Sequence, residues 1–194
     1  APDLGSGVVR RVGSSPISRT KNKLEAFKIL SWRLFNWLDM NKHQLCCIGH
    51  ITLDKVVTPQ NTVYMPGGTA FYCSHAIRHF NDINYALVTA VGATEMNVVE
   101  QLREMGIHVT ALPSKYSVYF ENIYGANPDD RTQRVLAKAD PFTAGQLKDI
   151  DAQIYHLGSL LSDDFSLEVI KELSQRGLIA VDSQGYLREV RDTH

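Results

Sequence analysis

The chain has 194 residues, 44% of them hydrophobic, and a formal net charge of −1 at pH 7. This length is enough for one hydrophobic core, and the near-neutral charge gives no electrostatic basis for binding nucleic acid. Three cysteines, two of them adjacent, exclude a disulfide framework and lack the spacing of a metal-binding motif. We predict that all three are small buried hydrophobes in a reducing compartment. No apolar run is long enough to cross a bilayer, so a cytoplasmic location is expected.

Residues 1–43 differ from the rest because they carry eight basic and only three acidic residues. Residues 1–17 are rich in Gly, Ser, Pro and Arg, which predicts disorder or a non-native leader. Apolar residues at 22–38 recur at helical spacing and predict a basic amphipathic helix. Its function is left open among a membrane-surface helix, a partner-binding helix, a targeting peptide and upstream non-native sequence. We therefore separate residues 1–43 from an α/β domain at 44–194.

The domain begins with an arrangement suited to a ligand rich in hydroxyl groups. The predicted elements are a strand at 45–48 closed by Gly49, an extended run at 63–65, and a helix at 69–80. Asp54 is expected just past a strand end, facing Gly67 and Gly68 at the helix start. A carboxylate accepts hydrogen bonds from two hydroxyls, and glycines let the backbone approach a ligand closely. Free N–H groups at the helix N-terminus add donors.

The remaining elements alternate between strand and helix, with one interruption. Strands are predicted at 85–91, 107–112, 152–157 and 178–182, and helices at 94–105, from Thr143, and from Ser162 to Arg176. This alternation indicates βαβ units and a mainly parallel sheet. Alternating runs at 116–124 and 131–138, joined by a good turn at 125–130, predict a hairpin that interrupts the series.

This order of elements resembles the ribokinase-like (PfkB-type) carbohydrate kinase family across residues 45–191. The motifs that carry the resemblance are Gly49, Asp54, Gly67 with Gly68, 89–92, 106–109 and 181–185. The resemblance implies a doubly wound, mainly parallel α/β sheet with a small β lid near 51–65 and 116–138. It also implies transfer of a phosphoryl group from ATP, assisted by Mg²⁺, to a hydroxyl of a sugar, nucleoside or cyclitol. A lid of this kind further implies a homodimer paired through lid strands.

The sequence departs from this family in one respect that bears on catalysis. The loop of type Asp-Thr-x-Gly-Ala-Gly-Asp, which supplies the family's anion hole and catalytic base, has no counterpart before His194. We therefore expect no catalytic residue and only a small part of the ATP and Mg²⁺ site, as in a substrate-binding half truncated before the nucleotide-binding half. The alternative is a non-catalytic protein that retains a sugar pocket or docks on a partner. Motifs for dinucleotide and P-loop binding are also absent.

Nine residues are expected to contact the acceptor. They are Asp54, Gly67, Gly68, Thr69, His50, Tyr72, Phe120, Asn122 and Gln184. Tyr72 stands where many relatives carry asparagine, which favours a different or bulkier polyol. The alternation of the lid strand separates Phe120 and Asn122 from their neighbours, but does not tell which pair faces inward. His50 is equally compatible with a site residue and a structural one.

Two other groups receive weaker interpretations. Asp182 and Gln184 end the last predicted strand, where open α/β sheets bind ligands, and resemble this position in relatives acting on inositol or nucleosides. His75 and His79 lie one helical turn apart, but without a third ligand they are interpreted as structural, and no metal site is predicted.

Overall fold

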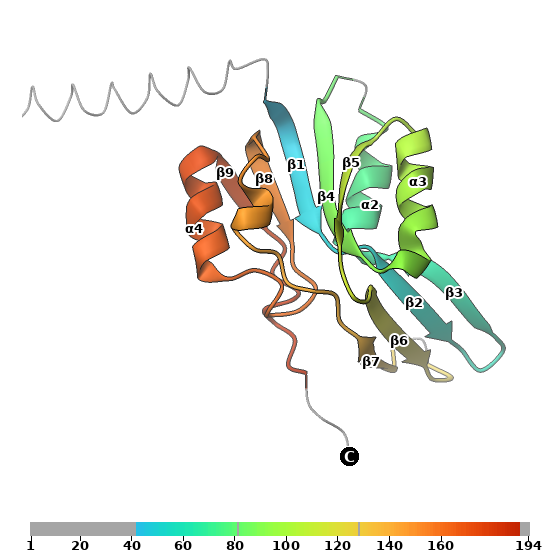
Figure 1. Ribbon diagram of the computed structural model, residues 1–194. Helices are drawn as coiled ribbons and strands as arrows, with labels where there is room; N and C mark the ends of the chain where they lie inside the picture. The colour runs from blue at the N-terminus through green and yellow to red at the C-terminus, as the bar shows by residue number, and fades with distance from the viewer. Residues whose placement is uncertain (1–41, 81, 128, 191–194) are drawn as a thin grey trace, which may run out of the picture. The chain divides into compact units, whose positions relative to one another are not determined.

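The computed structural model describes residues 42–80, 82–127 and 129–190. The leader at 1–17 and the amphipathic helix predicted at 22–38 lie outside this part of the chain. The described residues form two β-sheets with helices packed on the larger one (Figure 1). Among their helices, none combines the length and apolar composition that a membrane span needs.

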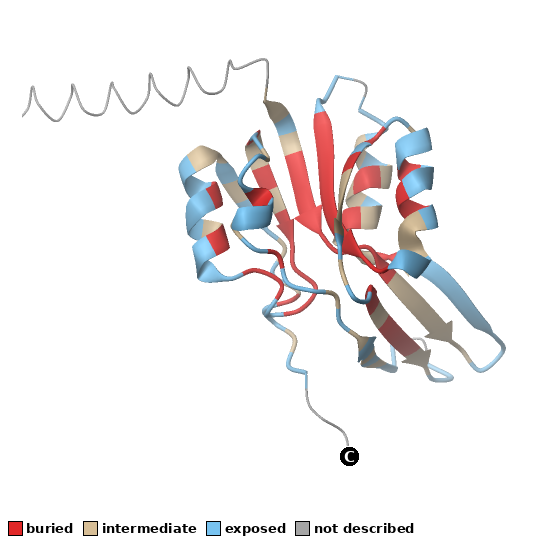
Figure 2. Cartoon of the chain, viewed as in Figure 1, coloured by how far each residue is buried: buried red, intermediate tan, exposed pale blue. Residues whose placement is uncertain are grey.

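The larger sheet contains five parallel strands in the order β5-β4-β1-β8-β9. Their bounds are β1 (His43–Gly49), β4 (Tyr85–Val91), β5 (His108–Pro113), β8 (Ala152–Gly158) and β9 (Leu178–Val181). Every residue of β4 is buried, since helices cover both faces of the sheet (Figure 2). This parallel sheet confirms the predicted fold class.

Helices on opposite faces of this sheet enclose two separate apolar cores. One face carries α2 (Gly68–Ile77), the short 3₁₀ turn η1 (Ala93–Glu95) and α3 (Met96–Glu104); the other carries η2 (Gly145–Leu147) and α4 (Leu167–Arg176) (Figure 1). Successive strand residues point to opposite faces. Cys46 therefore packs in the core with Leu173 of α4, whereas Cys47 packs in the core with Leu102 of α3.

The smaller sheet lies beyond the carboxyl end of β1 and corresponds to the predicted lid (Figure 1). Its strands are β3 (Thr62–Gly67), β2 (Thr52–Val57), β6 (Val118–Tyr124) and β7 (Arg131–Ala137), in the order β3-β2-β6-β7. Strand β2 pairs antiparallel with β3 and parallel with β6, and β6 with β7 forms the predicted hairpin. The lid is far less buried than the larger sheet, and much of β3 is exposed (Figure 2).

Several helix boundaries differ from the prediction: α2 ends at Ile77 rather than at residue 80, and α3 begins at Met96 rather than at residue 94. Helix α4 begins at Leu167, not Ser162, because the Ser166 hydroxyl caps it by accepting the Val169 N–H at 3.3 Å. Asp164, expected in the first turn of that helix, instead accepts backbone N–H groups of the preceding loop. The capping box of Thr143 and Gln146 forms as predicted, but it precedes only the single turn η2.

Candidate functional site

A cleft of about 750 Å³ lies where the lid meets the first turns of α2 and the carboxyl ends of β8 and β9. The lid contributes Thr52, Asp54, Phe120, Asn122, Arg131 and Gln133, among others. Helix α2 contributes Gly68, Thr69, Tyr72 and Cys73, and the far wall contains His156, Leu160, Gln184 and Arg188. The position is that of ligand sites in open α/β folds, beyond the carboxyl ends of the strands.

Asp54 is half-buried in this cleft and lies on a strand rather than just after one. It was expected just past the end of β1, and it lies within β2, inside the span 51–65 expected for the lid, because 52–57 pairs with strands on both sides. The Thr52 hydroxyl donates to Asp54 Oδ1 at 2.8 Å and so orients the carboxylate. Burial raises the pKa of Asp54, and the hydrogen bond from Thr52 and the charges of Arg188 and Arg131 oppose this shift.

The two glycines perform different structural tasks at the start of α2. Gly67 packs against the Asp54 side chain: a Cβ there would lie 2.5 Å from Oδ2. Gly68 has φ +88, and a Cβ would lie 2.5 Å from the backbone oxygen of His50. Gly67 is buried beside the cleft, and Gly68 lines it. No side-chain hydrogen bond caps the start of α2, and the first N–H groups of a helix have no partner within that helix.

Thr69, Asp182 and Gln184 form a hydrogen-bonded network on the opposite wall. The Thr69 hydroxyl donates to Asp182 Oδ2 at 2.7 Å, and Gln184 Nε2 donates to the same oxygen at 2.6 Å. Gln184 Nε2 also reaches Thr69 Oγ1 at 2.9 Å. Burial opposes ionisation of Asp182, but the hydrogen bonds from Thr69 and Gln184 outweigh it and lower the pKa. Asp182 thereby orients two side chains that line the cleft.

The lid strand β6 directs Phe120 and Asn122 into the cleft. The alternation of side chains along this strand did not tell which pair faces the ligand. Asn122 accepts a hydrogen bond from Gln133 Nε2 of β7 at 2.8 Å. Between them in sequence, Glu121 pairs with Lys55 at 2.8 Å outside the cleft lining. A polar pair and an aromatic ring therefore face the ligand space from the lid.

Two arginines in the cleft lining were not anticipated. The Arg188 guanidinium donates to the Leu160 backbone oxygen at 2.9 Å and to Gln184 Oε1 at 3.2 Å, and lies 5.3 Å from the centroid of the Phe120 ring. Arg131 lines the cleft from the start of β7. Arg188 follows the last strand in irregular chain, where no periodic pattern predicts a direction for a side chain.

His50 and Tyr72 lie differently relative to the cleft. His50 is fully buried outside the lining, stacked on Phe142 at 4.5 Å, with Nδ1 3.3 Å from the Ala90 oxygen. The carboxylate of Asp164 lies 3.6 Å from its Nε2. These contacts match the structural interpretation of His50. Tyr72 lines the cleft and is 54% exposed, so its ring is accessible to a ligand.

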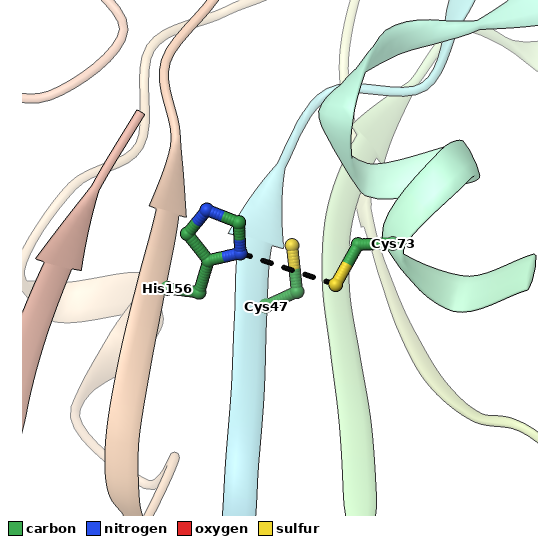
Figure 3. A group of neighbouring side chains, drawn as sticks. All are labelled: Cys47, Cys73 and His156. Carbon is green, nitrogen blue, oxygen red and sulfur yellow. Dashed lines mark hydrogen bonds between the residues drawn. The ribbon is translucent and has the colours of Figure 1, made fainter. Parts of the chain in front are cut away.

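Cys73 is not simply a buried hydrophobe, because it lines the cleft beside His156. Its Sγ lies 3.9 Å from His156 Nδ1, and Cys47 lies beside both (Figure 3). Hydrogen bonds from Cys47 and His156 lower the pKa of Cys73 to about 5, and contact with Cys73 raises the pKa of His156. By contrast, burial raises the pKa of Cys46 to about 12.

No protein-family model and no curated protein matches the sequence. Solved structures do match. A sulfate complex of a pyrophosphate-dependent kinase in the ribokinase family is 25% identical, with a TM-score of 0.66 over 77% of this chain and 53% of that chain. Phosphofructokinase-2 from Escherichia coli with fructose-6-phosphate is 18% identical, with a TM-score of 0.52 over 72% of this chain and 55% of that chain. The fold is ribokinase-like.

A nucleoside kinase from Burkholderia thailandensis in complex with inosine has the same ribokinase-like fold. It is 18% identical, with a TM-score of 0.57 over 74% of this chain and 53% of that chain. These structural neighbours confirm the resemblance found in the sequence. The chain spans about half the length of the solved structures that it matches.

The described part of this ribokinase-like cleft does not fit Mg²⁺. Asp54 is the single carboxylate among the described lining residues, and its Oδ1 already accepts from Thr52. Mg²⁺ requires a near-octahedral set of oxygen ligands, usually with more than one contributed by protein and phosphate. We therefore assign no Mg²⁺ to these residues.

Proposed function

We propose that this chain provides the acceptor-binding half of a ribokinase-like kinase, and that the acceptor is a small polyhydroxylated compound: a sugar, a nucleoside or a cyclitol. The observation that carries the proposal is the half-buried Asp54 carboxylate, which lies against Gly67 at the uncapped N-terminus of α2 and lines a cleft under a β lid. Structural neighbours form complexes with inosine, fructose-6-phosphate and myo-inositol, which are all polyhydroxylated, and this supports the proposed class.

In this proposal the described residues bind and orient the acceptor. Asp54 accepts hydrogen bonds from two neighbouring hydroxyls, which requires the ionised carboxylate. Gln184 and Asn122, each held by a hydrogen bond to another side chain, provide polar contacts on facing walls. The Phe120 ring packs against apolar carbon atoms of the ligand. Such positioning is the main contribution that a protein makes to phosphoryl transfer.

The phosphoryl donor belongs to a part of the site that the described residues do not form. The sequence resemblance implies ATP with Mg²⁺, and one structural neighbour is pyrophosphate-dependent, so we propose ATP or pyrophosphate as the donor class. Mg²⁺, when bound, neutralises phosphate charge during such transfers.

We also propose that a second copy of the chain pairs with the lid. Strand β3 is an edge of the lid sheet, and Val63, Tyr64 and Met65 on it are exposed. Exposed apolar edge strands favour pairing with another strand. Sedimentation velocity over a wide concentration range tests this: a monomer throughout would refute it.

A thermal-shift screen tests the acceptor class. Sugars, nucleosides and inositols at millimolar concentration are added to the chain, because a ligand that binds only the folded state raises the unfolding midpoint. We expect at least one polyol to raise the midpoint of the wild-type chain and to leave Asp54→Asn unchanged. If no polyol shifts the midpoint, or if both proteins respond equally, the proposed role of the cleft is wrong.

A further inference from the structure

Two thiols and an imidazole converge on the α2 face of the larger sheet. Cys47 of β1 and His156 of β8 occupy paired positions in the parallel register, so they are neighbours on one face. Cys73 projects towards them from the second turn of α2 (Figure 3). The ligand atoms of all three residues lie within 4.8 Å of one another, and Cys73 Sγ to His156 Nδ1 is 3.9 Å.

These distances are close to those of a bound thiophilic cation. Zinc binds thiolate sulfur at about 2.3 Å and imidazole nitrogen at about 2.0 Å, which spaces tetrahedral sulfur and nitrogen ligands about 3.5 Å apart. Closing the observed gap therefore needs a small side-chain rotation. Thiolate and imidazole ligands favour Zn²⁺ over Mg²⁺ or Ca²⁺, which prefer oxygen.

The different burial of the three ligands indicates where the fourth coordination position of a bound cation would lie. Cys47 is fully buried behind the others, whereas Cys73 and His156 both line the cleft. A cation held by the three would therefore have protein on three sides and the cleft on the fourth. Sites with three protein ligands and an open position are those at which a metal reaches solvent or a ligand.

We propose that Cys47, Cys73 and His156 form a three-ligand site for a thiophilic divalent cation, with Zn²⁺ as the ion to test, whose fourth position opens into the cleft. The site is separate from any Mg²⁺ that assists phosphoryl transfer, because its ligand atoms are two sulfurs and a nitrogen. It also stands independently of the proposed acceptor class. Within the described residues, His75 and His79 do not join it.

Cobalt provides the first test, because it reports ligand type and geometry in the unaltered chain. The protein is reduced, freed of metal with a chelator and titrated with Co²⁺. We expect one Co²⁺ per chain, with thiolate-to-cobalt charge-transfer absorption and the intense visible bands of tetrahedral cobalt, displaced by one equivalent of Zn²⁺. Weak octahedral bands without charge transfer would overturn the proposal.

Three variants locate the site. Cys73→Ala and His156→Ala each remove one ligand and should weaken Zn²⁺ binding, measured against a chromophoric chelator, at least as much as the roughly 10- to 100-fold that follows loss of a residue that only orients a ligand. Cys46→Ala is the control, since Cys46 lies next to Cys47 on β1, is as fully buried as Cys47 and packs in the core on the opposite face of the sheet. It should retain wild-type affinity. Unchanged affinity in Cys73→Ala, or equal loss in Cys46→Ala, would place the metal elsewhere and refute the site.

Discussion

Gly67 touches the carboxylate of Asp54: a methyl group on the glycine would lie 2.5 Å from Oδ2 and 2.9 Å from Thr52 Oγ1. Both of these atoms are side-chain ends that can rotate away. We therefore predict that Gly67→Ala displaces the Asp54 carboxylate without unfolding the protein. Calorimetric titration should show polyol affinity reduced at least about tenfold, the loss expected for one or two hydrogen bonds to a charged group. Unchanged affinity would show that the carboxylate does not contact the ligand.

Gly68→Ala should destabilise the fold, because the added methyl group would meet backbone rather than a side chain that can rotate away. Gly68 has φ +88, and its Cβ would lie 2.5 Å from the His50 carbonyl oxygen. A strained backbone of this kind costs about 1–3 kcal/mol. We predict a lower unfolding midpoint for Gly68→Ala than for Gly67→Ala, measured by thermal denaturation without ligand. Equal midpoints would contradict the distinction drawn between the two glycines.

The raised pKa of Asp54 predicts how acceptor binding depends on pH. The ionised carboxylate is the form that accepts hydroxyl hydrogen bonds, so affinity should fall as the pH is lowered through a pKa above the ordinary 3.8. In the ligand-free protein, the raised pKa means that ionised Asp54 reduces folding stability at neutral pH. Asp54→Asn should therefore bind weakly at every pH and unfold at a slightly higher temperature. An Asp54→Asn variant that unfolds at a lower temperature than wild type would contradict the predicted destabilisation by the ionised carboxylate.

Asp182→Asn should disturb the Thr69–Gln184 wall and reduce stability by about 1 kcal/mol at neutral pH, the scale of one hydrogen bond. The lowered pKa of Asp182 gives the pH dependence. Its stabilisation is complete above the ordinary value of 3.8 and is lost as the pH falls through the depressed folded value. Denaturant unfolding at pH 7 and below pH 3 should show the difference between wild type and variant shrinking in acid. If the difference in stability between wild type and variant were the same at both pH values, the loss would come from packing and not from the charge of Asp182.

The sequence predicted the layout of strands well because the signals are local. All seven residues of β4 were predicted because seven consecutive apolar or small residues produce a fully buried parallel strand. The lid hairpin was predicted from alternation on both sides of a turn. The predicted start of α4 was wrong because Ser162, Asp163 and Ser166 can all cap a helix. Only the hydrogen bonds that Asp164 accepts in the preceding loop decide among them.

The candidate site was only partly predictable, because distant residues meet there. The family resemblance located Asp54 and the glycine pair on one cleft. No local spacing could bring Cys47 and His156 together, since that depends on β1 pairing with β8. Likewise, the alternation of side chains along the lid strand did not show whether Phe120 faces the ligand or solvent. His50, beside a strand end, faces an aromatic pocket rather than the cleft.

Calorimetric titration of the chain with the polyol that stabilises it most is the most direct test of the cleft. It is run beside Asp54→Asn and beside Asp149→Asn, a control that neutralises an exposed carboxylate outside the cleft lining. We predict one binding site in the wild type, equal affinity in Asp149→Asn, and binding lost or weakened at least about tenfold in Asp54→Asn. Equal affinity in all three proteins would contradict the assignment of Asp54 as the acceptor-binding carboxylate.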